Sequence, residues 1–238
     1  MIKPLWVVVP AAGFGARMGG TLPKQYQPMA GSCMLEHTLQ RLLQVPEIAG
    51  FVVVLAPDDA HWQTIPSASN PRILTTPGAD TRAGSVVAGL QYVLDKADDQ
   101  PWVLVHDAAR PLICTTDIKR LIDAVYNSGA IGGILATPVQ DTLKSADEYC
   151  CINKTVNREG LWQAQTPQLF NADQLLGAMH SSMKLAAESI TDESSAMEAA
   201  GHEPLLVEAL KPNLKVTRPV DFQIATALLE SNSAGALS

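Results

Sequence analysis

Short apolar runs along the chain alternate with segments in which apolar residues recur at the spacing of a helix. The runs are rich in β-branched residues and too short for helices, which is typical of buried strands; they cover 6–9, 51–56, 72–76, 102–105, 131–137, 205–208 and 214–216. The helical spacing predicts helices at 35–43, 86–94, 116–128, 172–183, 191–200 and 219–229. This alternation predicts an α/β fold with a single doubly wound, mostly parallel sheet of the Rossmann-like type.

The alternation breaks between residues 139 and 161. Two extended segments, 139–144 and 149–156, flank a polar turn, which predicts a β-hairpin arm that projects from the sheet. An isolated hairpin is only marginally stable, yet this one carries apolar residues, namely Val139, Leu143, Tyr149, Ile152 and Val156. We therefore expect the arm to pair with a second copy of the chain in a homodimer.

The first strand passes directly into a loop of residues with little or no side chain, namely Ala11, Ala12, Gly13 and Gly15. Backbone N–H groups of such a loop can approach a bulky anion closely, which predicts a phosphate cradle. Two cations, Arg17 and Lys24, follow on the same loop, and Pro23 favours extended backbone around the second one. Their positions suit the clamping of a polyphosphate.

Several interpretations compete for this loop. A P-loop requires Gly-Lys-Ser or Gly-Lys-Thr after its glycines, which this loop lacks. The dinucleotide-binding fingerprint is opposed by Met18, where a small residue is needed, and by Pro23, which interrupts the helix that should follow. The spacing resembles the signature loop of sugar-nucleotide pyrophosphorylases and cytidylyltransferases. A surface loop with two solvated cations also fits the loop taken by itself.

A second polar segment, 106–111, follows the strand at 102–105. Ligands of such sheets bind at the carboxyl ends of the strands, so we expect this segment to lie beside the small-residue loop. Asp107 is a candidate Mg²⁺ ligand there, because Mg²⁺ in phosphate sites takes one or two carboxylates together with substrate oxygens. The alternative is that Asp107 caps a turn or a helix. We assign no chemical role to His106.

The composition is that of a globular protein, with 47% hydrophobic and 17% charged residues, and it predicts no membrane span. We expect one domain over 1–238, with a frayed tail at 231–238. The net charge of −7 argues against nucleic-acid partners. The four cysteines lack Cys-x-x-Cys spacing and the apolar start is interrupted by Pro4 and Pro10, so we expect a cytoplasmic protein with reduced thiols and no signal peptide.

Several motifs occur together in a fixed order between residues 7 and 221. They are PAAGFGARM with PKQY, the block 80–85, VHDAARP, the Asp-Thr pair at 141–142, TVNREGLW, QTPQLF, ITDESSA and NLKVTRP. In this order they resemble the 2-C-methyl-D-erythritol 4-phosphate cytidylyltransferase family. The resemblance implies a nucleotidyltransferase that moves CMP from CTP to methylerythritol phosphate, releases pyrophosphate, and serves non-mevalonate isoprenoid biosynthesis. It implies Mg²⁺ as cofactor, with other divalent cations possible.

The resemblance also implies roles for individual residues. Catalysis would rest on Arg17, Lys24, Arg158 and Lys215. CTP would be held by Ala11, Ala12, Gly13, Lys24, Ala79, Asp80 and Ser85. The acceptor would be bound by Asp107, Arg110, Thr142, Arg158, Thr191 and Lys215, with Asp107 also holding the metal. Thr142 and Thr191 fit equally well as a strand residue and a helix cap. If the arm crosses to a partner, Arg158 reaches the neighbouring active site.

Two positions depart from the family pattern: Ala79 stands where the family commonly has glycine, and Gln140 where its arm often has a basic residue. Proteins with other functions also contain motifs of these kinds. Cytidylyl transfer to ribitol 5-phosphate or another polyol phosphate requires much of the same loop. A non-catalytic nucleotide-binding module would keep the fold without the activity. A nicotinamide-dependent oxidoreductase is disfavoured by Met18 and Pro23.

Overall fold

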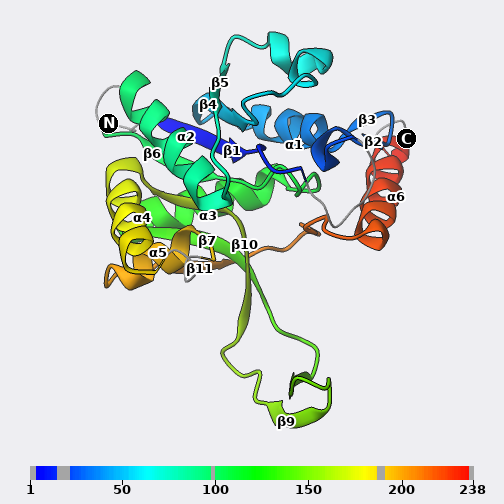
Figure 1. Ribbon diagram of the computed structural model, residues 1–238, viewed down its shortest axis with the longest axis vertical. Helices are drawn as coiled ribbons and strands as arrows, with labels where there is room; N and C mark the ends of the chain where they lie inside the picture. Colours follow the sequence, from blue (N-terminus) through cyan, green and yellow to red (C-terminus); the bar gives the residue numbers. More distant parts are fainter. Residues whose placement is uncertain (1–3, 15–21, 98–99, 187–190, 236–238) are drawn as a thin grey trace.

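The computed structural model describes residues 4–14, 22–97, 100–186 and 191–235. Its centre is a seven-stranded sheet in the order β11-β7-β10-β6-β1-β4-β5 (Figure 1). The strands of this sheet are β1 Leu5–Pro10, β4 Ile48–Leu55, β5 Ile73–Pro77, β6 Trp102–Val105, β7 Gly132–Pro138, β10 Trp162–Asn171 and β11 Leu205–Glu208. Only β10 runs antiparallel to its neighbours β6 and β7, whereas the other pairs are parallel. The predicted doubly wound, mostly parallel sheet is confirmed.

Helices cover both faces of the sheet, because successive strand residues point to opposite sides. In β1, Val7 and Val9 belong to the apolar cluster beneath α1 and α3, whereas Val8 belongs to the cluster beneath α2, α4 and α5. The helices are α1 Met34–Leu43, α2 Arg82–Lys96, α3 Thr115–Ser128, α4 Ala172–Ala186, α5 Glu193–Ala199 and α6 Pro219–Gly235. Each fully buried aliphatic side chain stabilises the fold by about 1.5–3 kcal/mol. The two clusters therefore hold the strand ends of β1, β4 and β6 rigidly in register.

Smaller elements complete the fold. A third apolar cluster joins α6 to the short pair β2 Pro28–Met29 and β3 Ser32–Cys33. Short 3-10 helices span η2 Lys24–Tyr26, η3 Trp62–Thr64 and η4 Pro66–Ser69. The extended backbone predicted around Lys24 is therefore wrong at Lys24 itself, which begins a helical turn. Within the described residues, no helix is both long and apolar enough to cross a membrane.

The structure differs from the sequence-based expectations at three places in the C-terminal half. The segment 165–168, which was not expected to be a strand, lies within the ten-residue strand β10. Its glutamines and Pro167 hide it from a search for apolar runs, and its pairing with β7 shifts register between Ala164 and Gln168. Residues 214–216 form no strand, although the N–H of Val216 donates to the carbonyl of Ala109. The predicted frayed tail begins too early, because α6 continues to Gly235 without a helix-breaking residue; 236–238 lie outside the described residues.

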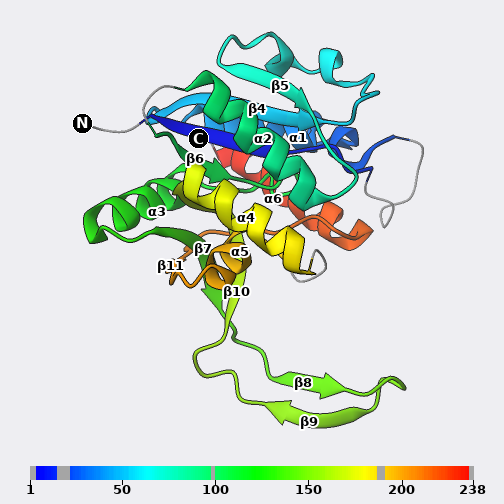
Figure 2. The ribbon, with the colours of Figure 1, turned by 60° about the vertical axis from the view of Figure 1, so that its left-hand side comes forward.

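The arm stands apart from the sheet (Figures 1 and 2). The strands β7 and β10 extend together toward it, and beyond them β8 Leu143–Ala146 pairs antiparallel with β9 Ile152–Val156. The predicted hairpin is confirmed, with shorter strands than expected. Tyr149 is 79% and Ile152 67% exposed, so the arm leaves these two apolar side chains unburied.

Candidate functional site

A cavity of about 480 Å³ opens at the carboxyl ends of the parallel strands. Its walls come from the loop after β1, the turn between β5 and α2, the segment after β6 and the C-terminal segment around Lys215. The structure brings together nine of the residues expected in the site: Ala11, Ala12, Gly13, Lys24, Ala79, Asp80, Ser85, Asp107 and Lys215. The prediction that the segment after β6 lies beside the small-residue loop is confirmed.

The loop after β1 is held by backbone and amide hydrogen bonds. The N–H of Ala11 donates to the carbonyl of Val54 at 2.8 Å, and the side-chain amide of Gln25 donates to the carbonyl of Ala11 at 2.7 Å. The N–H of Lys24 closes the loop on the carbonyl of Phe14 at 3.1 Å. Gln25 is buried and lines the cavity, a role that its sequence position alone did not indicate. Arg17 lies outside the described residues.

The turn before α2 packs directly against this loop. A side chain at Gly78 would approach the Cβ of Ala12 to 2.6 Å, so only glycine permits the close approach of the two turns. The side chain of Thr81 caps α2 by accepting from the N–H of Gly84, and the hydroxyl of Ser85 accepts from the N–H of Ala79 at 3.1 Å. The positive end of the α2 dipole therefore borders the cavity, an arrangement that favours phosphate.

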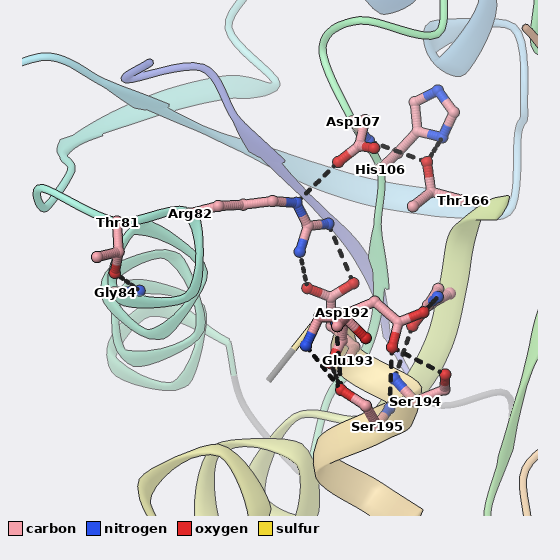
Figure 3. A network of polar contacts seen from close by, with 12 residues as sticks. Thr81, Arg82, Gly84, His106, Asp107, Thr166, Asp192, Glu193, Ser194 and Ser195 are labelled. Carbon is pink, nitrogen blue, oxygen red and sulfur yellow. Dashed lines mark hydrogen bonds and ion pairs between the residues drawn. The ribbon is translucent and has the colours of Figure 1, made fainter. Parts of the chain in front are cut away.

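Asp107 is paired with three cations, of which Figure 3 labels Arg82. One carboxylate oxygen lies 2.8 Å from the Lys215 Nζ, the other lies 2.9 Å from the Arg82 Nε, and the Arg110 Nε lies 3.7 Å away. Burial alone raises the pKa of Asp107, but the charges of Arg82, Lys215 and Arg110 outweigh it and hold the pKa well below its usual range. Asp107 is therefore an anion at neutral pH, and it does not serve as the cap of a helix or turn through its side chain.

The segment 213–217 carries Lys215 to this network although it lies far away in sequence. The side-chain amide of Asn213 donates to the carbonyl of Thr166 at 2.7 Å, and the Arg110 guanidinium donates to the carbonyl of Asn213 at 2.7 Å. The Lys24 Nζ donates to the carbonyl of Val216 at 3.0 Å. Lys24 and Lys215 both line the cavity, and Lys24 contacts the segment that carries Lys215.

Comparison with known proteins agrees with this geometry. The sequence profile described as 2-C-methyl-D-erythritol 4-phosphate cytidylyltransferase matches residues 5–231. The chain belongs to this family. It is 47% identical over 223 residues to the enzyme of that name from Ectopseudomonas mendocina (strain ymp), covering 93% of this chain and 94% of that protein. It is 48% identical over 222 residues to the one from Stenotrophomonas maltophilia (strain R551-3), covering 93% and 95%.

Solved structures of the family share the fold. A crystal structure of 4-diphosphocytidyl-2C-methyl-D-erythritol synthase is 38% identical, with a TM-score of 0.81 over 95% of this chain and 98% of that chain. The 2-C-methyl-D-erythritol 4-phosphate cytidylyltransferase of Francisella tularensis is 33% identical, with a TM-score of 0.80 over 94% and 98%. The similarity therefore extends over nearly the whole chain and is not confined to the phosphate loop.

Four residues that the family resemblance assigned to the acceptor do not line the cavity. Arg110 is buried behind Asp107, with one guanidinium nitrogen bound to the carbonyl of Asn213. Thr142 and Arg158 are exposed on the arm. Thr191 is exposed ahead of α5, and the cap of that helix is Asp192, so the interpretation of Thr191 as a helix cap is wrong. Among the described residues, Asp107 and Lys215 are the two of the six assigned acceptor residues that line the cavity.

His106 is a buried part of the scaffold. Its ring contacts the hydroxyl of Thr166 at 3.1 Å and the carbonyl of Arg110 at 3.3 Å, and it does not line the cavity. Burial lowers its pKa to about 4, despite the nearby Asp107. A neutral imidazole is therefore expected at neutral pH.

The carboxylates of the cavity suit a metal that is shared with a substrate. Among residues 4–14, 22–97, 100–186 and 191–235, no group of three or more His, Cys, Asp or Glu side chains could hold a metal alone. Asp80 and Asp107 line the cavity, and Asp107 is ionised. Such a site fits Mg²⁺, which takes one or two carboxylates and completes its shell with phosphate oxygens and water.

Proposed function

We propose that this protein transfers CMP from CTP to 2-C-methyl-D-erythritol 4-phosphate, giving 4-diphosphocytidyl-2-C-methyl-D-erythritol and pyrophosphate. The observation that carries the proposal is the cavity in which Lys24, Lys215 and the ionised Asp107 face the small-residue loop after β1. Membership of the family supports it. The reaction belongs to non-mevalonate isoprenoid precursor biosynthesis.

The triphosphate of CTP would lie along the loop after β1 and the beginning of α2. Backbone N–H groups at Ala12 and Gly13 would donate to its oxygens, since among the described residues, chain neighbours aside, no atom lies within 4 Å of the position that a Gly13 side chain would occupy. Three cations surround Asp107, and Lys24 lines the same cavity. This excess of positive charge favours a polyanion despite the negative charge of the whole chain.

The chemistry requires positioning and charge more than proton transfer. A phosphate oxygen of the acceptor would attack the α-phosphorus of CTP, and the bond from this phosphorus to the bridging oxygen of pyrophosphate would break. That nucleophile is already an anion at neutral pH, so no histidine base is needed. Lys24 would release the carbonyl of Val216 and donate to the α-phosphate, and Arg17 is assigned the same task.

Asp107 would hold Mg²⁺, although other divalent cations also suit an oxygen site. An ion held by Asp107 would supply positive charge beside the phosphates, where negative charge develops during the transfer. The low pKa of Asp107 keeps its oxygens available as ligands, and the phosphates would compete for Lys215 and Arg82.

We further propose a homodimer in which the arm completes the acceptor site of the neighbouring copy. The arm exposes Tyr149 and Ile152, and Arg158 is exposed at its base, outside the cavity of its own chain. An arm that crosses to a partner would bury the apolar residues and deliver Arg158 and Thr142 to the acceptor. The free cysteines Cys33, Cys114, Cys150 and Cys151 support a cytoplasmic location.

The test is a pyrophosphate-release assay with CTP and a panel of acceptors. Turnover with methylerythritol phosphate well above that with ribitol 5-phosphate is expected. Faster turnover with ribitol 5-phosphate than with methylerythritol phosphate would instead identify ribitol 5-phosphate or a related polyol phosphate as the acceptor. Binding of CTP without turnover on any acceptor would favour a non-catalytic module. Lys184→Ala, which removes an exposed lysine on α4, serves as a control that should not alter the rate.

A further inference from the structure

Glu193 is a buried carboxylate that does not line the cavity. Its side chain is 0% exposed, although it is the first residue of α5. A buried charge is strongly unfavourable unless it is paired and hydrogen-bonded, so the surroundings of Glu193 reveal what it does. The family resemblance assigned it no role.

Both oxygens of Glu193 accept from the guanidinium of Arg82. The Nη1 of Arg82 donates at 2.7 Å and its Nη2 at 3.2 Å, which is the forked geometry of a strong Arg–carboxylate pair. The Nε of the same guanidinium donates to Asp107 at 2.9 Å. Figure 3 shows Arg82 placed between the two carboxylates. Because a guanidinium is planar, contact at both ends fixes its orientation.

Glu193 is itself held in place from the sheet. Asp192 caps α5 by accepting from the N–H of Ser195, and it accepts from the side-chain amide of Gln168 at 2.9 Å. The N–H of Ser194 donates back to the same amide group at 2.8 Å. A continuous chain of contacts therefore runs from β10 through the start of α5 to Arg82 and Asp107.

We propose that Glu193 is a positioning residue, which holds Arg82 so that only its Nε reaches Asp107. The other carboxylate oxygen of Asp107 then stays directed at Lys215, 2.8 Å away. Without the charge of Glu193, Arg82 can turn its fork onto both oxygens of Asp107, the pairing that a guanidinium and a carboxylate favour. This rotation engages the carboxylate oxygen that now contacts Lys215, and it withdraws that oxygen from Lys215 and from the cavity.

The kinetic part of this inference rests on the proposed cytidylyl transfer. Glu193→Gln keeps the shape of the side chain and removes its charge. We expect kcat to fall by about 10- to 100-fold, because small misplacements of reacting groups have effects of this size, while the KM for CTP stays within about threefold. Arg82→Lys should lower kcat similarly. If Glu193 acts through Arg82, the double variant should be no worse than Arg82→Lys within about threefold.

The matched control is Glu198→Gln, which removes the same charge from an exposed position of α5 and should behave as wild type. Thermal unfolding shows whether each variant is folded at the assay temperature. Wild-type kcat in folded Glu193→Gln would overturn the inference, even if its unfolding temperature falls. Additive losses in the double variant would also overturn it, since they mean that Glu193 acts independently of Arg82.

A crystal structure of Glu193→Gln tests the inference without any activity. We expect Arg82 to have turned from position 193 toward both oxygens of Asp107. An unchanged Arg82 would contradict the inference. Lack of wild-type turnover on every acceptor would instead count against the proposed function, and the crystal structure would still decide the role of Glu193.

Discussion

The cavity and the arm differ in how far they bury their candidate functional residues. At the cavity, Asp107 is 5% exposed and three cations hold it. On the arm, Tyr149 is 79% exposed and Arg158 is exposed as well. The contacts of Asp107 therefore come from within one chain, whereas Tyr149 and Arg158 are left exposed by their own chain.

The two regions should therefore contribute differently to the stability of the fold and to the activity. The apolar clusters on both faces of the sheet stabilise the fold and fix the walls of the cavity. The hairpin β8–β9 adds backbone hydrogen bonds but little apolar burial, so the fold should tolerate changes there. Substitutions at the cavity should consequently alter the rate of the reaction, and substitutions of the exposed apolar residues on the arm should alter assembly.

The largest expected effect is that of replacing Lys24, which lines the cavity. Lys24→Ala should lower kcat by ~10²-fold or more and weaken CTP binding less, because its charge is needed most as charge grows on the α-phosphate. Arg17→Ala should behave in the same way. Steady-state kinetics with CTP varied provide the measurement. A raised KM with a normal kcat would mean that the residue binds the ground state instead.

The next effect concerns the proposed metal. Asp107→Asn removes one anionic ligand, so half-maximal turnover should require more Mg²⁺, and a chelator should abolish turnover of the wild type. Asp173→Asn, at an exposed position of α4, is the matched control. An unchanged Mg²⁺ titration for Asp107→Asn would reject Asp107 as the ligand.

A smaller effect is expected on the arm. Tyr149→Ser should weaken the proposed dimer by about tenfold, since a buried aromatic residue commonly contributes more than 1 kcal/mol to an interface. Its unfolding temperature, measured at a concentration where both proteins are monomeric, should match that of the wild type, because the side chain is largely exposed within one chain. Sedimentation equilibrium gives the dissociation constant, and an unaltered constant would exclude Tyr149 from the interface.

The last prediction is a dependence of stability on pH that arises from the buried His106. The pKa of His106 is lowered to about 4 in the fold, from an ordinary value near 6.5. The unfolded chain therefore takes up the proton first as the pH falls. Stability should decline between about pH 6.5 and pH 4, by roughly 1 kcal/mol per pH unit at the steepest point.

The groups that face His106 are Asp107, Arg110 and Thr166, and Asp107 and Arg110 stay charged throughout this range. Chemical denaturation of the metal-free protein at several pH values provides the measurement. The slope should be flatter in His106→Gln and unchanged in His202→Gln. Equal slopes in the wild type and His106→Gln would show that His106 does not titrate as expected.

Local patterns in the sequence were sufficient for most of the sheet. The strand 102–105 was placed at its observed bounds because a buried parallel strand is a continuous apolar run. The segments that follow β1 and β6 also lie side by side as expected, because the carboxyl ends of parallel strands meet at one edge of the sheet. By contrast, β10 was missed since its polar residues and Pro167 resemble a loop. The Arg82–Glu193 pair joins positions 111 residues apart, and no local spacing reveals such a contact.

The central claim is that the cavity of one chain and the arm of another form one active site. The direct measurement is the activity of a mixture of Lys24→Ala and Arg158→Ala under conditions of demonstrated subunit exchange. Each variant alone should be nearly inactive. If Arg158 acts in the neighbouring site, a mixed dimer has one site with both defects and one with neither, so activity should return toward a quarter of the wild-type value, as expected for random mixing of equal amounts. A mixture that stays inactive would contradict the shared site, because every site would then retain one defect.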